Sequence, residues 1–268
     1  AVSKNLQALE QELGVPLLTR SVRGVELTEF GRILLRRARL ADVELRKAQD
    51  EIAEAAGFRH GVVRVGMSST GEALLAAPAI RRFRERHPDT LVHVRGGTAP
   101  TLVGLLREGQ LDFAVSPIPR AVLGTDLRAE RMLSSQLVVV VRSGHPKADA
   151  TSLAELQDCE WVHGTRPGEL EPAVVAAFRR EQLPPPRFAV QRDSFSALIF
   201  LLLNSDYVAL SAEPTVRPFC RPGLLQRVPM KGLVESVQLL LTPATRPLTT
   251  QAQSLAAEIR RAARAHRR

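Results

Sequence analysis

Hydroxyl side chains gather at four places in this chain, each directly after a predicted strand and before a predicted helix. They lie in segments 67–70, 96–98, 164–168 and 193–196, which read Met-Ser-Ser-Thr, Gly-Gly-Thr, Gly-Thr-Arg-Pro-Gly and Asp-Ser-Phe-Ser. At the carboxyl ends of parallel strands such segments point free backbone N–H groups into one crevice, and a helix N-terminus favours an anion. The pattern predicts a site for a small anionic molecule. Serine and threonine are also ordinary helix N-caps, and this alternative remains open.

The residues offer no recognisable catalytic arrangement. The stretch Gly66–Gly71 places its second glycine one residue too late for the turn that presents a nucleophilic serine. The six histidines have no paired metal-ligand spacing, and no phosphate loop or dinucleotide fingerprint is present. Cys159 has Asp158 beside it and no basic neighbour to lower its pKa, so we expect an inert thiol. We therefore expect no catalytic residue, no metal and no resident cofactor.

Composition is typical of a water-soluble globular protein. The 268 residues are 44% hydrophobic and 24% charged. The two cysteines fit neither a metal site nor a disulfide framework, which favours a reducing cytoplasm. No apolar run approaches the ~20 residues of a membrane helix, so we expect no membrane partner. The net charge of +9 invites a nucleic-acid interpretation, but residues 1–60 hold ten Lys and Arg against nine Asp and Glu. The excess charge therefore does not mark a DNA-reading surface.

Strand and helix patterns alternate from residue 61 onward, which predicts an α/β fold of parallel strands with crossover helices. Proline, glycine and capping residues separate the elements. The first set has strands at 62–65, 91–94 and 111–115, with helices at 71–86 and from residue 98. A buried strand at 137–141 precedes the second set, which has strands at 161–163, 188–191, 207–210 and 237–241 and helices at 172–181, 194–204 and from residue 249. Two such sets suggest two lobes with a cleft between them.

The first residues read as part of a longer unit. Val2, Leu6, Leu9 and Leu13 form one helical stripe that Gly14 ends. A small β-ribbon with its tip at residues 21–24 is expected next. No helix-start signal stands ahead of the first helix, so we expect the second half of a DNA-reading module whose first half is missing.

A long helix should begin at Thr28, a good N-cap followed by an acidic residue. Its apolar positions alternate steps of four and three, which predicts a helix that packs along another helix. They are Leu34, Ala38, Ala41, Leu45, Ala48, Ile52 and Ala55. The alternative is an ordinary amphipathic helix that lies on its own domain.

Three stretches together resemble the LysR-type transcriptional regulators. The first runs over residues 1–31, with Leu13–Leu18, Arg23–Val25 and Leu27-Thr28 followed by Gly31 as its most specific parts. The others are Phe83–Pro88 with residues 105–114, and Tyr207–Leu210.

The resemblance implies a fold and a set of domains. Residues 1–28 would be the recognition helix and wing of a winged helix-turn-helix whose first two helices are absent. Residues 29–57 would be a linker and dimerisation helix. Residues 61–268 would be an effector-binding domain similar to periplasmic binding proteins, with two Rossmann-like subdomains. Lobe I would span 61–137 with 242–268, and lobe II would span 138–241.

The resemblance also implies site residues. It would place Ser3 and Lys4 in the DNA major groove and Arg20 and Arg23 on or near the wing, types that suit phosphate and base contacts. For Ser3 the alternative is a plain helix-surface residue. The inducer would bind between the lobes at Ser68, Ser69, Thr70, Thr98, Thr165, Ser194 and Phe195. To these we add Arg166, a cation that would suit a carboxylate or sulfonate.

The predicted function is a ligand-responsive DNA-binding transcriptional regulator that binds a small organic, anionic effector. Its expected partners are promoter DNA, the inducer, a second copy of the chain in a homodimer or homotetramer, and RNA polymerase. The alternative is a two-lobed solute-binding protein without a DNA role, for which residues 1–28 and the heptad helix would have no use.

Overall fold

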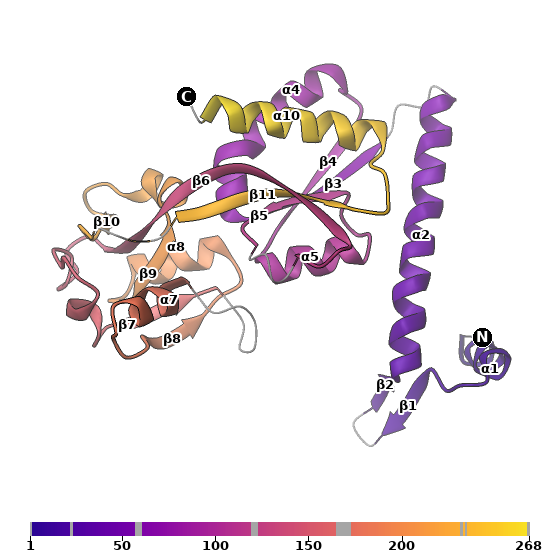
Figure 1. Cartoon of the computed structure of the whole chain (residues 1–268), viewed down its shortest axis with the longest axis horizontal. Helices are drawn as coiled ribbons and strands as arrows, with labels where there is room; N and C mark the ends of the chain where they lie inside the picture. Colours follow the sequence, from indigo (N-terminus) through magenta and orange to yellow (C-terminus); the bar gives the residue numbers. More distant parts are fainter. Residues whose placement is uncertain are drawn as a thin grey trace.

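The computed structural model describes residues 2–21, 24–56, 61–118, 123–164, 173–230, 233 and 235–266. Figure 1 shows a small N-terminal part, one long helix and a larger α/β part. The larger part contains three of the four predicted binding segments, at 67–70, 96–98 and 193–196, and residues 165–168 of the fourth lie outside the described ranges.

The N-terminal part begins with helix α1 (Val2–Leu13), and Gly14 follows it with a φ of +68°. This is the left-handed C′ glycine that the sequence predicts. Strands β1 (Leu18–Ser21) and β2 (Gly24–Leu27) then pair antiparallel as the expected ribbon. Glu10 ties the ribbon to α1, because its Oε1 accepts hydrogen bonds from the backbone of Leu17 at 2.7 Å and Leu18 at 3.1 Å.

The long helix α2 (Glu29–Ala55) starts at the predicted cap. Thr28 Oγ1 accepts a hydrogen bond from the Gly31 backbone at 2.9 Å, which satisfies one of the free N–H groups of the first turn. One face of α2 packs on the α/β part through the buried Val43. Its large seam residues Leu45 and Ile52 are 66% and 68% exposed in the single chain.

The first half of the α/β part is built on three parallel strands in the order β4-β3-β5. These are β3 (Val62–Met67), β4 (Leu91–Gly96) and β5 (Phe113–Ser116). One face packs on a helix that runs without a break through α3 (Ser69–Gly71), η1 (Glu72–Ala76) and α4 (Ala77–Arg86), and on α10 (Thr250–His266). Helix α5 (Ala99–Arg107) covers the other face.

The second half repeats this three-layer plan. Strands β8 (Arg187–Gln191), β7 (Glu160–His163) and β9 (Val208–Ala212) are neighbours and parallel. Helix α7 (Ala173–Arg180) packs on one face around Trp161 and Phe178, and α8 (Phe195–Leu203) packs on the other. Short elements complete this half: η2 (Ala154–Leu156), α9 (Glu213–Val216), η3 (Arg217–Phe219) and β10 (Leu225–Arg227).

Two long strands connect the halves (Figure 1). Strand β6 (Leu127–Arg142) pairs over 127–136 with β11 (Glu235–Pro243), and over 137–140 with β9. The predicted strand at 137–141 is therefore only the second part of β6. Because β6 and β11 are antiparallel to their neighbours, the sheet is mixed, whereas the sequence predicts parallel strands.

The pairing of β11 also bears on the expected lobes. Leu239–Leu241 of β11 pair with Ser116–Ala114 of β5. This strand therefore belongs to the sheet of the first half, although the boundary expected at residue 241 assigned it to lobe II. We use "first half" for residues 61–136 with 235–266 and "second half" for residues 137–230. Among the helices of the described ranges, none combines the length and apolarity needed to cross a membrane.

Candidate functional site

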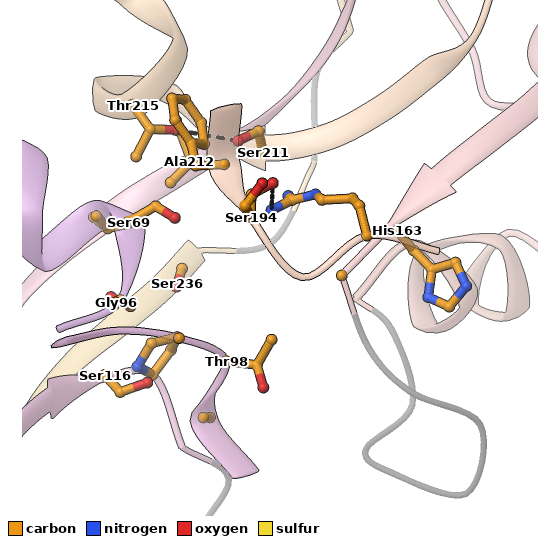
Figure 2. A pocket seen from close by; sticks show the side chains of 18 of the residues that line it. Ser69, Gly96, Thr98, Ser116, His163, Ser194, Ser211, Ala212, Thr215 and Ser236 are labelled. Atoms are coloured by element: carbon orange, nitrogen blue, oxygen red, sulfur yellow. Dashed lines mark hydrogen bonds between the residues drawn. The ribbon is translucent and has the colours of Figure 1, made fainter. Parts of the chain in front are cut away.

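A pocket of about 720 Å³ lies between the two halves, at the carboxyl ends of β3, β4, β5, β7 and β8. We call it the central pocket. Six of the eight predicted ligand residues line it: Ser68, Ser69, Thr70, Thr98, Ser194 and Phe195. Figure 2 shows Ser69 and Thr98 from the first half facing Ser194 from the second. The other two, Thr165 and Arg166, lie outside the described residues.

Two of these hydroxyl groups already serve the fold as helix caps. Ser68 Oγ accepts from the Gly71 backbone at 3.3 Å and also contacts Gln238 Oε1 at 2.7 Å. Ser194 Oγ accepts from the Ala197 backbone at 3.1 Å at the start of α8. The N-cap interpretation of the sequence is therefore correct for both residues, and a ligand would share their hydroxyl groups with the backbone.

The remaining predicted hydroxyl groups are free of helix capping. Thr98 occupies the N-cap position of α5, yet its Oγ1 lies 3.1 Å from Thr101 Oγ1 and caps no backbone group. The hydroxyl groups of Ser69 and Thr70 make no hydrogen bond to another described side chain or backbone group. These three residues have hydrogen-bonding capacity to offer to a bound molecule.

Arg192 is the main site residue that the sequence analysis missed. It follows β8 directly, lines the central pocket, and its Nη1 donates to the Ser194 carbonyl at 3.3 Å. Its guanidinium Cζ lies 3.5 Å from the position a Cβ would take on Gly164. Its buried Nε has no hydrogen-bond partner among the described residues. Burial lowers the pKa of Arg192, an effect that the charge of Asp193 opposes, but a guanidinium stays protonated at neutral pH.

The first half contributes two further residues that the sequence analysis did not select. Ser116 ends β5, and its buried Oγ has no partner in the part of the chain that the structure describes. Glu72 lies in η1, one turn beyond Ser68, and also lines the pocket. Burial raises the pKa of the Glu72 carboxyl. Both are polar groups at the pocket wall, so a ligand could complete their interactions.

His163 lines the central pocket at the end of β7. Its ring packs on Phe188 with centroids 4.2 Å apart, and Figure 2 shows it pointing away from Thr98 and Ser194. Burial, together with the charge of Arg192, lowers the pKa of His163. The neutral imidazole therefore adds no positive charge to the pocket at neutral pH.

The other predicted features can be placed only in part. Ser3 and Lys4 lie on α1 and Arg20 on β1, but their side chains, like all of Arg23, are outside the described residues. No cluster of three His, Cys, Asp or Glu suited to a metal occurs within the described ranges. Burial raises the pKa of the Cys159 thiol, which keeps it in its weakly nucleophilic form.

Comparison with known families gives two matches that together cover most of the chain. Residues 56–264 match the family described as LysR substrate binding domain. Residues 1–32 match the family described as bacterial regulatory helix-turn-helix protein, lysR family.

Individual relatives agree with these matches. The chain is 30% identical over 232 residues to the HTH-type transcriptional regulator GbpR of Azospirillum brasilense, across 85% of the chain and 68% of the relative. It is 28% identical over 253 residues to the HTH-type transcriptional regulator GalR of Pseudomonas putida, across 91% of the chain and 64% of the relative.

Solved structures share the fold. The structure of CbnR, a LysR family transcriptional regulator, aligns with a TM-score of 0.68 and 21% identity, over 98% of this chain and 89% of that one. The effector binding domain of QuiR in complex with shikimate aligns with a TM-score of 0.66 and 15% identity, over 77% of this chain and 99% of that one.

Proposed function

This chain belongs to the LysR family of transcriptional regulators, and we propose that it senses a small organic anion bound in the central pocket. The members of this family are regulators that bind DNA and small effectors, and they are not enzymes. The specific proposal is the chemistry of the effector and the residues that hold it. For the described part of the site these residues are Ser69, Thr70, Thr98, Ser194, Phe195 and Arg192, with Ser68 in a supporting position.

Arg192 is the single observation that carries the anion proposal. A half-buried guanidinium with an unpartnered Nε faces the same pocket as the starts of α5 and α8. A planar guanidinium binds a carboxylate through two parallel hydrogen bonds, and helix N-termini add free N–H groups and a favourable dipole. Thr165 and Arg166 stay predicted ligand residues of the same site.

Relatives with the same fold support an organic acid as the effector class. The QuiR effector domain was solved with shikimate, and the BenM effector domain with its effector benzoate. These molecules are small enough for a pocket of about 720 Å³. Their low identity to this chain, 15% and 17%, leaves the particular acid open to experiment.

The proposed mechanism is a shift between two arrangements of the halves. Effector contacts on both sides of the pocket favour the arrangement in which the halves lie closer together. Strands β6 and β11 connect the halves, and Leu137 and Ser236 on them line the pocket, so bending here changes its width. Helix α2 is attached to the first half through Val43 and an ion pair between Arg39 and Glu108 at 3.0 Å. A change in the halves can therefore reach the DNA-reading end.

The remaining parts of the proposal concern partners and domains. We assign residues 1–28 to DNA binding through Ser3, Lys4, Arg20 and Arg23, residues 29–57 to dimerisation, and the rest to effector binding. The proposed partners, in the cytoplasm, are promoter DNA, further copies of the chain in a homodimer or homotetramer, and RNA polymerase. A solute-binding protein without a DNA role is disfavoured, because residues 1–32 match a helix-turn-helix family.

The test combines an effector screen with a DNA-binding measurement on the complete gene product. Duplexes selected from a random-sequence library report DNA binding by fluorescence anisotropy, and a panel of organic acids is screened by thermal shift. We expect at least one acid to raise the melting temperature and to change DNA affinity or DNA bending. Arg192→Gln should abolish the response to that acid, whereas Arg187→Gln on the exposed edge of β8 should not. An acid response that Arg192→Gln leaves unchanged would refute the assignment.

A further inference from the structure

Two acidic residues and one arginine line the described part of the central pocket: Asp193 stands beside Arg192 in the second half, whereas Glu72 comes from the opposite half. Glu72 belongs to the helix that follows β3 in the first half, and Arg192 follows β8 in the second. Neither the carboxylate of Glu72 nor the Nε of Arg192 has a hydrogen-bond partner among the described residues. A binding site for a simple anion has no use for a carboxylate at its wall, because like charges repel.

The carboxylate of Glu72 lies close to Gly96. A Cβ on Gly96 would lie 2.8 Å from Glu72 Oε1, so a side chain at residue 96 would displace the carboxylate. Gly96 is the last residue of β4 and itself lines the pocket, as Figure 2 shows. The absence of a side chain here leaves the acid group room beside the start of α5.

We propose that the effector carries an ammonium group as well as an acid group, with Glu72 binding the ammonium and Arg192 the acid. An α-amino acid or a related zwitterion is the ligand class that this charge pair fits. The inference rests on the proposed function, because it assumes that the central pocket is the effector site. Such a ligand bridges the two halves with one charge on each, so its binding favours the closer arrangement of the halves.

The rest of the pocket wall is compatible with a zwitterion that has a side chain of its own. The same pocket is lined by the hydroxyl groups of Ser69 and of Thr98, the latter 3.1 Å from Thr101 Oγ1, and a hydroxyl group can bind either an ammonium or a carboxylate. Val162, Val174 and Leu210 add apolar surface in the second half. The volume of about 720 Å³ exceeds what a backbone-sized zwitterion fills, so a side chain also enters the pocket.

The experiment screens the chain against matched sets of three compounds by thermal shift and calorimetry. Each set holds an amino acid, its deaminated acid and its decarboxylated amine, for example phenylalanine, 3-phenylpropionate and phenethylamine, or leucine, 4-methylpentanoate and 3-methylbutylamine. All twenty amino acids are tested. We expect at least one amino acid to bind at least about tenfold more tightly than both of its analogues, because each analogue leaves one charged wall group unpaired.

The variants separate the two charges. Glu72→Gln should weaken amino-acid binding at least about tenfold and should not weaken binding of the deaminated acid, because the amide keeps the shape and loses the charge that repels an anion. The same variant tests the alternative that Glu72 is protonated and donates a hydrogen bond. In that case glutamine would preserve the affinity for the amino acid. Arg192→Gln should weaken both the amino acid and the acid. Glu85→Gln on the exposed side of α4 is the matched control, with no expected effect.

Several outcomes would overturn the proposal. A deaminated acid that binds as tightly as its amino acid, or an affinity unchanged by Glu72→Gln, would leave the anion effector in place and remove the ammonium. Binding of no amino acid in the panel would also refute it. A coupling between Glu72→Gln and Arg192→Gln in the stability of the ligand-free chain would assign the two groups to each other instead. If neither Arg192→Gln nor Glu72→Gln weakens binding of the acid, the result counts against the proposed function itself.

Discussion

The hydroxyl group of Ser68 stabilises the fold around the central pocket. It caps the helix after β3 and contacts the buried Gln238 of β11 at 2.7 Å. We expect Ser68→Ala to lower the free energy of unfolding by about 2 kcal/mol, because a cap is lost and a buried amide oxygen loses its donor. Urea denaturation should show a lower midpoint with an unchanged slope.

The control for this prediction is another pocket serine, which caps no helix and is not buried. Ser196 is exposed, and its only side-chain hydrogen bond within the described part of the chain is to the Ser194 hydroxyl at 3.3 Å. Ser196→Ala should change stability by less than about 0.5 kcal/mol. Equal losses in the two variants would show that Ser68 holds neither the helix start nor Gln238.

Single residues of the pocket could be predicted where a strand end leads directly into a helix. Ser69, Thr98 and Ser194 were found in this way, because parallel strands bring their carboxyl ends to one edge. Arg192 lies at such an end too, but it is not part of the hydroxyl pattern that marks the other segments. Glu72 lies inside a helix, and its carboxylate lies close to Gly96, a residue distant in sequence, which no local pattern reveals.

Among the elements, strand β6 marks the limit of pattern-based prediction. Its second part, 138–141, is a fully buried apolar run that pairs with both β9 and β10, and the sequence predicts it. Its first part pairs with β11 alone and is mostly exposed along residues 128–131. The polar residues of this part give no alternation strong enough to predict a strand. The connection between the halves, which matters most for their relative motion, was therefore missed.

The attachment of helix α2 to the first half gives a prediction at the same scale. Arg246 donates to the Leu106 carbonyl at the end of α5 at 2.9 Å and approaches Glu44 of α2 at 4.0 Å. Arg246→Met should leave stability within about 1 kcal/mol, because a partly exposed ion pair contributes little. It should broaden the distance distribution between spin labels on α2 and α10, measured by pulsed electron resonance after Cys159 and Cys220 are replaced.

A second substitution on α10 serves as the control for the broadened distance distribution. Arg260 on α10 pairs with Glu130 at 2.8 Å, away from α2, so Arg260→Met should leave the same distribution narrow. A distribution that Arg246→Met also leaves narrow would mean that packing at Val43 alone fixes the helix.

At the scale of the whole molecule, the sequence predicted two α/β units and a preceding helix, and the fold contains them. Alternation of strands and helices is a strong signal because it follows from burial on both faces of a sheet. The antiparallel pairing of β11 with β5 was not predicted, since a strand far along the chain carries no mark of its neighbour. Neither can one chain's pattern show what covers the heptad seam of α2.

That seam supplies the last prediction, which concerns self-association. Leu45 and Ile52 are 66% and 68% exposed, on a helix whose opposite face already packs through Val43. In the proposed dimer these leucine and isoleucine side chains are buried against a second α2. Leu45→Asp combined with Ile52→Asp should therefore raise the dimer dissociation constant at least about 100-fold, because two charges would enter an apolar interface.

Sedimentation velocity over a concentration series measures this change. The control is Leu35→Asp, an exposed leucine on the same helix about 100° away from the seam position Leu34. It should leave the dissociation constant within about threefold. A double seam variant that sediments like the unmodified chain would assign the contact between copies to another surface, and α2 would then be an amphipathic helix that serves its own chain alone.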